Sequence, residues 1–439
     1  MAPGVWFRSG RGRSALVSLV VTIGLLPLAH APAAQARELP QPGVPKSHAR
    51  ADGMPAIPVV IPAARTASVV APPVVFSDLT PADAWAKPAI NYVAGVNTWM
   101  RDFAANPDGT YAFQPDAIET RKYFARSVVA AFAPEELPDP TVVLSDVDPS
   151  SPWYPSAAIA VKHGWLTPDA TGAFHPDDPV TMAMVHRALV LALGLQPAAV
   201  ALNDMHTVDG VRFPVPANFG TTLLGMRLGL RYNAPVGKES MDVGPSDDLS
   251  RAQVAYSLYR AATEPSWNIT DLLEQYQAVQ LPNLAPRRMA LVRWGIKWVG
   301  YPYIWGGEWG LTKPEPAGLG GQPRPGFDCS GFTWWLLRAD DSVWKVAPPR
   351  PYAGFSLPQR SSADMAAGTA TRIPFAKLRP GDMMFYDGDG NGVTDHVDTY
   401  IGNGFALDSS STPGGVTIMW VGTGWYRDHF LFGRRILPT

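Results

Sequence analysis

The chain has 439 residues, of which 36 are basic and 38 acidic, so its formal net charge is −2. This balance excludes recognition of nucleic acid or of an anionic membrane surface through bulk charge. Fifteen tryptophans and 46% hydrophobic residues are enough to build real cores, and the length favours more than one domain. Gly and Pro make 85 residues, a high share that still falls short of the composition of a generally disordered chain.

The first residues have the pattern of a signal peptide. Three arginines within residues 8–13 precede the apolar run 15–28, and residues 34–36 have the small-x-small form of a cleavage site. The apolar run is too short for a comfortable membrane span, and no later stretch is long and apolar enough for one. We predict that residues 1–36 are removed on export and that residues 37–74 form a Pro/Ala-rich linker. The alternative is an uncleaved N-terminal anchor.

From residue 75 onward the sequence repeats itself. A proline, four residues and then a Thr or Ser that opens an apolar helix occur three times, beginning at Pro115, Pro176 and Pro245. A hydroxyl at the start of a helix can accept a bond from an unpaired backbone N–H of the first turn. Residues 85–93 and 153–163 predict a second helix in the first two copies. The predicted N-caps of the three helices are Thr120, Thr181 and Ser250.

These three units resemble S-layer homology repeats. The resemblance implies an all-α repeat bundle whose grooves bind cell-wall polysaccharide, and it places Arg121 and Arg251 where the family's Thr-Arg motif supplies a ligand-binding arginine. The second unit has Met182 at this position, and a thioether cannot form the paired bonds to an acidic group that a guanidinium forms. The alternative is that both arginines are surface residues that make only weak pairs. The predicted repeats are 75–138, 139–200 and, most diverged, 201–264.

Cys329 is the only cysteine of the chain. An exported chain with one cysteine cannot form an internal disulfide, so the thiol needs another role, and nucleophilic catalysis is the leading candidate. Cys329 stands just ahead of an apolar run that predicts a helix, and the positive end of a helix dipole favours a thiolate. Asp328 is placed to cap the same helix, although its charge partly opposes thiolate formation.

The predicted general base for this thiol is His396, which opens an alternating strand. Asp408 lies 12 residues later and returns alongside the strand in a predicted hairpin, where it would orient the imidazole. Asp398 is the competing orienter, but we expect its side chain to point parallel to His396 rather than towards it. His429, the other histidine of this region, is assigned a structural role.

Residues 290–437 resemble the NlpC-type peptidoglycan endopeptidases, which are papain-like cysteine hydrolases. The resemblance implies an α+β catalytic domain, a helix plus an antiparallel sheet, which we place at 289–439 after a linker at 265–288. It implies Cys, His and a polar third residue in that order, and the third residue is Asp408 here instead of the family's usual His, Asn or Gln. The matching segments are Pro302–Gly307, Asp328–Phe332, Pro380–Asp382 and His396–Val397.

The same resemblance implies further site residues. Tyr303 corresponds to a tyrosine near the nucleophile whose hydroxyl could assist the oxyanion, and we predict substrate contacts at Asp328 and Ser330. The segments 308–324 and 347–360 are longer than the family's usual links. They either shape the substrate groove or are tolerated surface insertions.

A calcium loop is predicted between two strands of this domain. Its oxygen ligands alternate and a glycine follows at the sharp turn, but the expected bidentate Glu is missing. The alternative is a polar hairpin tip, for which Asp and Gly are also expected. The candidate ligands are Asp387, Asp389, Asn391 and Asp395.

These patterns together predict a secreted protein that binds the cell wall and hydrolyses amide bonds in peptidoglycan stem peptides, next to a D-amino acid. No cofactor is required, apart from the candidate calcium. One alternative is acyl transfer or another amide hydrolysis on the same scaffold. The other is a non-catalytic wall-binding protein.

Overall fold

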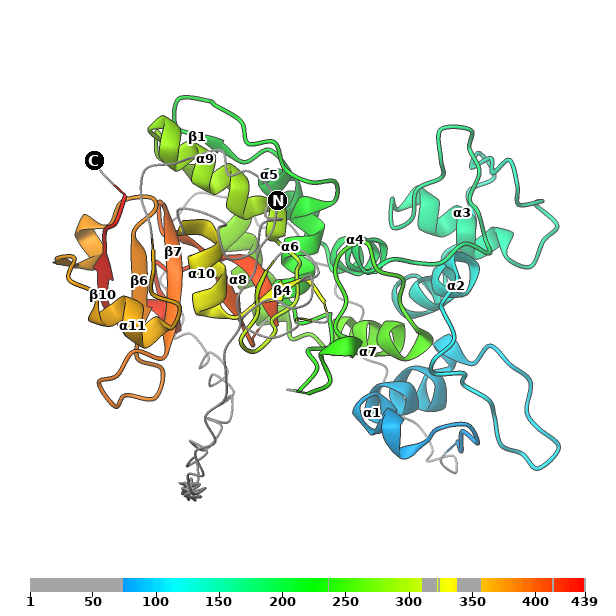
Figure 1. Ribbon diagram of the computed structural model, residues 1–439. Coiled ribbons are helices and arrows are strands. Elements are labelled where there is room, and N and C mark those ends of the chain that lie inside the picture. The colour runs from blue at the N-terminus through cyan, green and yellow to red at the C-terminus, as the bar shows by residue number, and fades with distance from the viewer. Residues whose placement is uncertain are drawn as a thin grey trace, which may run out of the picture. The chain divides into compact units, whose positions relative to one another are not determined.

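The computed structural model describes residues 74–235, 237–309, 322, 324–337, 357–412 and 414–437 (Figure 1). The predicted signal peptide and nearly all of the linker after it fall outside the described residues. Most of the two predicted insertions, 308–324 and 347–360, also lies outside them. In the part of the chain that the structure describes, no helix is both long and apolar enough to cross a membrane.

The described chain begins with a mainly helical part. Three of its helices begin directly after the residues predicted to cap them, so these three helix starts are confirmed. Ser250 forms a capping box with Gln253, and Thr181 accepts a bond from the N–H of Met184, whereas Thr120 has the N-cap position without a side-chain bond. The helices of this part are α1 (Lys87–Ile90), α2 (Arg121–Phe132), α3 (Tyr154–Lys162), α4 (Met182–Ala192), α5 (Gln196–Asn203), α6 (Phe219–Arg227), α7 (Arg251–Ala262) and α8 (Ser266–Tyr276).

This part is not purely helical. The two-residue strands β1 (His206–Thr207) and β2 (Gln280–Leu281) form a parallel pair that joins the third predicted repeat to the segment after α8. The second helix predicted at 85–93 is a succession of short turns around α1, whereas the one predicted at 153–163 is the regular helix α3.

A closed ring of backbone hydrogen bonds joins the three capped helices. The N–H of Glu119 donates to Leu249, that of Leu249 to Val180, and that of Val180 to Glu119, with N···O distances of 2.9 to 3.0 Å. All three residues are buried, where unpaired backbone groups are costly. The ring therefore satisfies one donor and one acceptor from each unit, and the sequence repeat corresponds to a structural repeat.

The first turns of the three helices extend this cyclic pattern. The first N–H groups of a helix have no partner within it. Here the first two N–H groups of α2 bond to the loop before α4, those of α4 to the loop before α7, and those of α7 to the loop before α2, so each unit depends on the next. The donor–acceptor pairs are Arg121–Asp178, Lys122–Pro176, Met182–Asp247, Ala183–Pro245, Arg251–Ala117 and Ala252–Pro115.

Arg251 lies inside this arrangement, with 2% of its surface exposed. Its guanidinium forms ion pairs with Glu119, at 2.9 Å, and Asp102, at 2.6 Å, and Nε donates to the carbonyl of Phe113 at 2.8 Å. Burial outweighs the attraction of Arg251 and raises the pKa of Glu119 to about 7. Arg251 is therefore a buried connection between the first and third units, and the alternative of a surface arginine is wrong.

Arg121 is buried as well, with 6% of its surface exposed. Its Nε donates to the carbonyl of Phe174 at 2.6 Å, and Nη2 donates to that of Thr167 at 3.0 Å. Met182 occupies the equivalent position of α4 and is also buried. Because both arginines bind acceptors within the protein, their predicted contact with a glycan stays a prediction.

The C-terminal part is built on a six-stranded sheet in the order β5-β10-β6-β7-β8-β9, with every neighbouring pair antiparallel. Helix α10 packs against β7 and β8, so the predicted helix plus antiparallel sheet is present. The strands are β3 (Glu308–Trp309), β4 (Gly326–Phe327), β5 (Arg372–Ile373), β6 (Met383–Tyr386), β7 (His396–Gly402), β8 (Phe405–Ser410), β9 (Gly415–Trp420) and β10 (Phe430–Arg434), and the helices are α9 (Pro286–Gly295), α10 (Cys329–Leu337), α11 (Ser362–Ala367) and α12 (Gly424–Asp428).

Aromatic side chains hold α10 in place. Phe332 and Trp335 of α10 are each 1% exposed, and their rings lie 5.1 and 5.9 Å from that of Phe327 on β4. Trp298, in the turn after α9, packs edge-on against Trp335 at 5.5 Å. Large buried rings contribute strongly to core stability, so this cluster fixes α10 relative to β4 and to the turn after α9.

We predict that Arg251→Met, which copies the side chain of the second unit, lowers the free energy of unfolding by about 3–5 kcal/mol, because it leaves the buried Glu119 without its cation and removes one of the two arginines paired with Asp102. Arg121→Met should cost less, about 1–3 kcal/mol, because the side-chain hydrogen bonds that it removes go to neutral acceptors. Chemical denaturation of the full chain measures both values. Equal losses would contradict the assigned role of Arg251.

Candidate active site

Cys329 is the first residue of α10 and is partly exposed. Oδ1 of Asp328 accepts bonds from the N–H of Gly331 at 2.5 Å and from the hydroxyl of Ser330 at 3.1 Å. The predicted helix start at Cys329 and the predicted cap by Asp328 are therefore confirmed. The thiol lies at the positive end of the helix dipole.

The glycines around Cys329 allow two backbone segments to meet. The N–H of Asp328 donates to the carbonyl of Gly307 at 2.9 Å. A methyl group at Gly331 would collide with this same carbonyl oxygen, and one at Gly307 would collide with the carbonyls of Ile304 and Gly326. A side chain at Gly331 would push α10 away from the segment that contains Tyr303, and one at Gly307 would push that segment away from β4.

Arg360 binds the residues on both sides of Cys329. Its Nη1 donates to Ser330 at 2.9 Å and contacts Asp328 at 3.2 Å, and its Nε donates to the buried carboxylate of Glu308 at 2.6 Å. The two predicted substrate contacts, Asp328 and Ser330, are thus engaged by an arginine. Sequence reasoning missed Arg360 because it ends a segment taken for an insertion, and no local pattern marks it.

His396 begins β7 and is buried, as predicted for a histidine held by a strand. Its Nε2 lies 3.0 Å from Oδ1 of Asp408 on β8, so the predicted hairpin brings the two residues together. The other oxygen of Asp408, Oδ2, accepts the hydroxyls of Tyr426 at 3.1 Å and Ser410 at 3.0 Å. Asp408 is therefore held in place independently of His396.

Asp398 also contacts His396, and the prediction that it points parallel to the histidine is wrong. Its Oδ1 lies 2.9 Å from Nε2 of His396. The register of β7 and β8 pairs Thr399 with Leu407, and its continuation places Asp398 opposite Asp408. Residues two apart on a strand share a face, and strand side chains lean along the strand, so the carboxylate reaches the ring.

The charges in this cluster are strongly coupled. Although burial opposes protonation of the imidazole, the carboxylates of Asp398 and Asp408 raise the pKa of His396 well above its usual value. Burial and the charge of Asp408 raise the pKa of Asp398 well above its usual range. Burial alone would also raise the pKa of Asp408, but the charge of His396 and the hydrogen bonds to Asp408 lower it. We therefore assign the negative charge mainly to Asp408.

Several contacts connect this cluster to the region of Cys329. The hydroxyl of Ser409 donates to the carbonyl of Phe327, two residues before the cysteine, at 2.9 Å. Tyr303 pairs with Phe327 in a short bridge. Burial, followed by the charge of Cys329, raises the pKa of Tyr303, and His396 and Asp408 are near enough to influence it. Tyr303 thus lies among the predicted nucleophile, base and orienter.

His429 lies outside this cluster. Its Nδ1 contacts the carbonyl of Trp425 at 2.8 Å, and its ring stacks on the same tryptophan at 4.5 Å. These contacts agree with the structural role assigned to it.

The predicted calcium loop connects β6 to β7. The carboxylate of Asp387 accepts the N–H groups of Asn391 at 3.1 Å and Gly392 at 2.7 Å, and that of Asp395 accepts the N–H of Gly388 at 2.9 Å. One oxygen each of Asp387, Asp389 and Asp395 lie within 4.8 Å of one another. Bonds within the loop account for these side chains as a hairpin tip, so calcium here stays a prediction.

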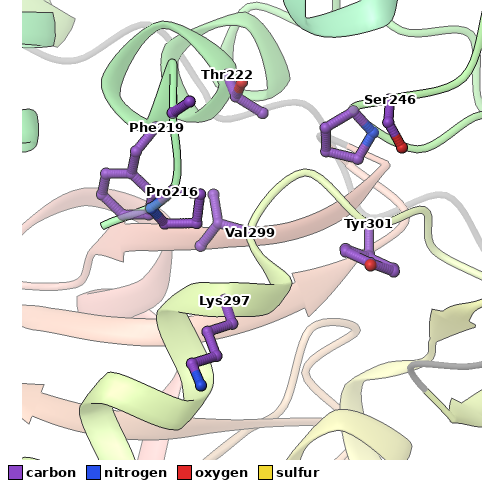
Figure 2. Close-up of a pocket in the computed structure, with 9 residues that line it drawn as sticks. Pro216, Phe219, Thr222, Ser246, Lys297, Val299 and Tyr301 are labelled. Carbon is purple, nitrogen blue, oxygen red and sulfur yellow. The ribbon is translucent and has the colours of Figure 1, made fainter. Parts of the chain in front are cut away.

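A separate cavity of about 150 Å³ lies away from these residues (Figure 2). Phe219 and Thr222 of α6 line one side of it, and Lys297, Val299 and Tyr301, which follow α9, line the other. Neither the nucleophile nor the base is among its lining residues, so this cavity is not the candidate active site.

Two parts of the chain match known families. Residues 300–435 match the NlpC/P60 family, and residues 144–181, within the second predicted repeat, match the S-layer homology domain. The bifunctional muramidase/DL-endopeptidase CwlT of Bacillus subtilis is 27% identical over 196 residues, which are 43% of this chain and 50% of that protein. The murein DD-endopeptidase MepH of Escherichia coli is 27% identical over 139 residues, which are 32% of this chain and 42% of that protein.

One solved structure is also similar. RipD of Mycobacterium tuberculosis, described as a non-catalytic NlpC/p60 domain protein adapted to peptidoglycan binding, is 22% identical, and the match covers 35% of this chain and 100% of that one, with a TM-score of 0.24. The chain thus spans half or less of the length of the two curated relatives described above. Residues 300–435 form an NlpC/P60 domain, and residues 144–181 form an S-layer homology domain.

Proposed function

We propose that this chain is a secreted, wall-bound cysteine endopeptidase that hydrolyses amide bonds in peptidoglycan stem peptides. The observation that carries the proposal is the buried pair of His396 and Asp408 in the sheet against which α10 packs, with Cys329 at the first position of α10. A nucleophile, a base and an orienting carboxylate are the groups that thiol catalysis needs. The peptidoglycan endopeptidases among the relatives support the choice of substrate.

The contacts of His396 suggest which ring nitrogen does the chemistry. Because Nε2 faces the two carboxylates, Nδ1 is the nitrogen left to exchange a proton with Cys329. Asp408 keeps the ring in this orientation and stabilises the imidazolium. The Tyr303 hydroxyl, whose pKa is raised by burial and by the charge of Cys329, stays protonated and can donate to the oxyanion.

The reaction then follows two stages. His396 removes the thiol proton, and Sγ of Cys329 attacks the amide carbonyl carbon, so a C–S bond forms and the carbonyl electron pair moves to oxygen. As the carbonyl re-forms, the C–N bond breaks and His396 donates the proton to the leaving amine. Water that is deprotonated by His396 attacks the thioester, the C–S bond breaks, and the carboxylic acid leaves. We expect the cleaved bond to lie next to a D-amino acid.

Cys329→Ala and His396→Ala should each lower the release of peptides from purified peptidoglycan at least about 1,000-fold, because each removes a group that makes or breaks bonds. His429→Ala is the matched histidine control and should stay within about threefold of the wild type, since its ring lies outside the cluster. Mass spectrometry of the released fragments measures the rates and identifies the bond.

The same experiment separates the alternatives. Equal release by Cys329→Ala and wild type would defeat the nucleophile assignment. No release by either would favour a non-catalytic wall-binding protein. Products joined to an added amine would indicate acyl transfer instead of hydrolysis.

We also propose that residues 75–264 are three S-layer homology repeats that attach the enzyme to cell-wall polysaccharide. The match at residues 144–181 and the closed ring of Glu119, Val180 and Leu249 support this proposal. The ring gives the three units equivalent backbone contacts. We therefore extend the assignment of the second unit, which contains the matched residues, to the first and third units.

If the repeats form the anchor, the Cys329→Ala protein should sediment with intact walls and lose most of this binding, at least about tenfold, when the secondary polysaccharide is stripped from the walls. The inactive protein is used so that the walls are not digested during the assay. Undiminished binding to stripped walls would place recognition in another part of the chain.

A further inference from the structure

Two buried carboxylates face the same edge of His396. Nε2 lies 2.9 Å from Oδ1 of Asp398 and 3.0 Å from Oδ1 of Asp408. The three residues are 4%, 0% and 1% exposed, respectively. An imidazole nitrogen carries at most one hydrogen, which can point at only one of the two oxygens at a time. One carboxylate would suffice to orient the ring, so the second needs its own explanation.

The two carboxylates differ in their other contacts. Asp408 accepts bonds from Tyr426 and Ser410 through Oδ2. The side-chain contacts of Asp398 are instead those to His396, to Asp408 itself and to the hydroxyl of Tyr386. A buried carboxylate is destabilising unless a cation pairs with it, and His396 is the group among these contacts that can carry a positive charge, so this contact offsets the burial of Asp398.

Among the residues that the structure describes, the groups that surround the pair offer Asp398 no cation other than His396. The rings of Tyr386 and Tyr426 lie 5.6 and 6.2 Å from that of His396. The titratable neighbours of the pair are the acids Asp395 and Asp408, together with tyrosine hydroxyls. The imidazole of His396 is therefore the one group among them that can pair with Asp398 as a cation. The titratable groups that face His396 are Tyr386 of β6, Asp395 before β7, Asp398 of β7 itself, Asp408 of β8, Tyr426 of α12 and Tyr303, and Tyr303 in turn faces the thiol of Cys329.

We propose that Asp398 is a second positioning residue for His396, which clamps the Nε2 edge of the ring together with Asp408 and so aims Nδ1 at Cys329. The catalytic value of this clamp rests on the proposed function, whereas the clamp itself is a property of the protein without substrate. The carboxylate oxygens and Nε2 lie within 4.8 Å of one another, so either carboxylate can hold the ring when the other is neutralised.

The test compares Asp398→Asn, Asp408→Asn and the double variant on a soluble stem peptide. Each single substitution should lower kcat about tenfold with little change in KM, because ring orientation acts on the chemical step. The double variant should lose at least about 1,000-fold, more than the roughly 100-fold product of the single effects, because the two carboxylates substitute for one another.

The dependence of kcat/KM on pH separates a positioning role from a merely structural one, because a merely structural role would not shift it. Asp398 and Asp408 both raise the pKa of His396, so the loss of either carboxylate lowers it. The imidazolium is then lost at lower pH, so the alkaline limb of kcat/KM should move to lower pH by about one unit. A variant whose kcat falls while this limb stays fixed would overturn the proposed contact.

Alkylation of Cys329 by iodoacetamide across the same pH range needs no substrate. If the clamp exists, the pH dependence of the alkylation rate should shift in Asp398→Asn even when the chain does not cleave peptidoglycan. Failure of the proposed function can therefore be distinguished from failure of the clamp. A folded Asp398→Asn protein with the wild-type alkylation profile, or a double variant no slower than Asp408→Asn, would overturn the proposal.

Thr399→Val is the matched control. Thr399 is fully buried, lies next to Asp398 on β7 and faces the opposite side of the strand. It should leave both readouts within about twofold of the wild type. Thermal unfolding of every variant verifies the fold, and Asp398→Ser supplies a second neutral side chain if the Asn variant does not fold.

Discussion

The candidate active site depends on an imidazole that can take up a proton while it is buried in a β-sheet. A buried charge that loses its partner costs several kcal/mol, so His396 requires a carboxylate beside it. The antiparallel register of β7 and β8 provides Asp408 for this purpose, and its continuation places Asp398 opposite Asp408. Tyr426 and Ser410 hold Asp408 in turn. The geometry of the base is therefore set by the sheet before any substrate arrives.

The helical part must also pair polar groups that would otherwise be unpaired, in this case backbone N–H groups at helix starts. Helix starts leave N–H groups without partners, and the three units satisfy them by bonding to one another in a cycle. Arg251 adds a buried cation between two carboxylates, Glu119 and Asp102, from the first unit. Because each unit completes its neighbour, we expect the three to fold together and not one by one.

Local patterns in the sequence were sufficient for the helix starts and for the core of the site. Hydroxyl residues ahead of apolar helices predict N-caps, and alternation predicts which residues of β7 share a face with His396. The position of Asp408 followed from the length of a hairpin. These features depend on residues that are close in the sequence, where spacing and chemistry are read directly.

The features that sequence reasoning missed depend on side-chain direction or on distant contacts. The two-residue spacing predicts that Asp398 shares a face of β7 with His396. Whether its carboxylate contacts Nε2 of His396 depends on the direction in which the side chain leans. Arg360 and Glu308 are 52 residues apart, and Arg251 and Glu119 are 132 apart. No periodic pattern connects such pairs. This is why the local sequence pattern does not predict the burial of Arg251, whereas its contact with a glycan stays a prediction.

The central claim is that Cys329 is a nucleophile activated by His396. The most direct measurement is the rate at which iodoacetamide alkylates Cys329 at neutral pH in the wild type and in His396→Ala. If the histidine holds the thiol ready as a thiolate, the rate should fall at least about tenfold in the variant. Equal rates in two folded proteins would contradict the account.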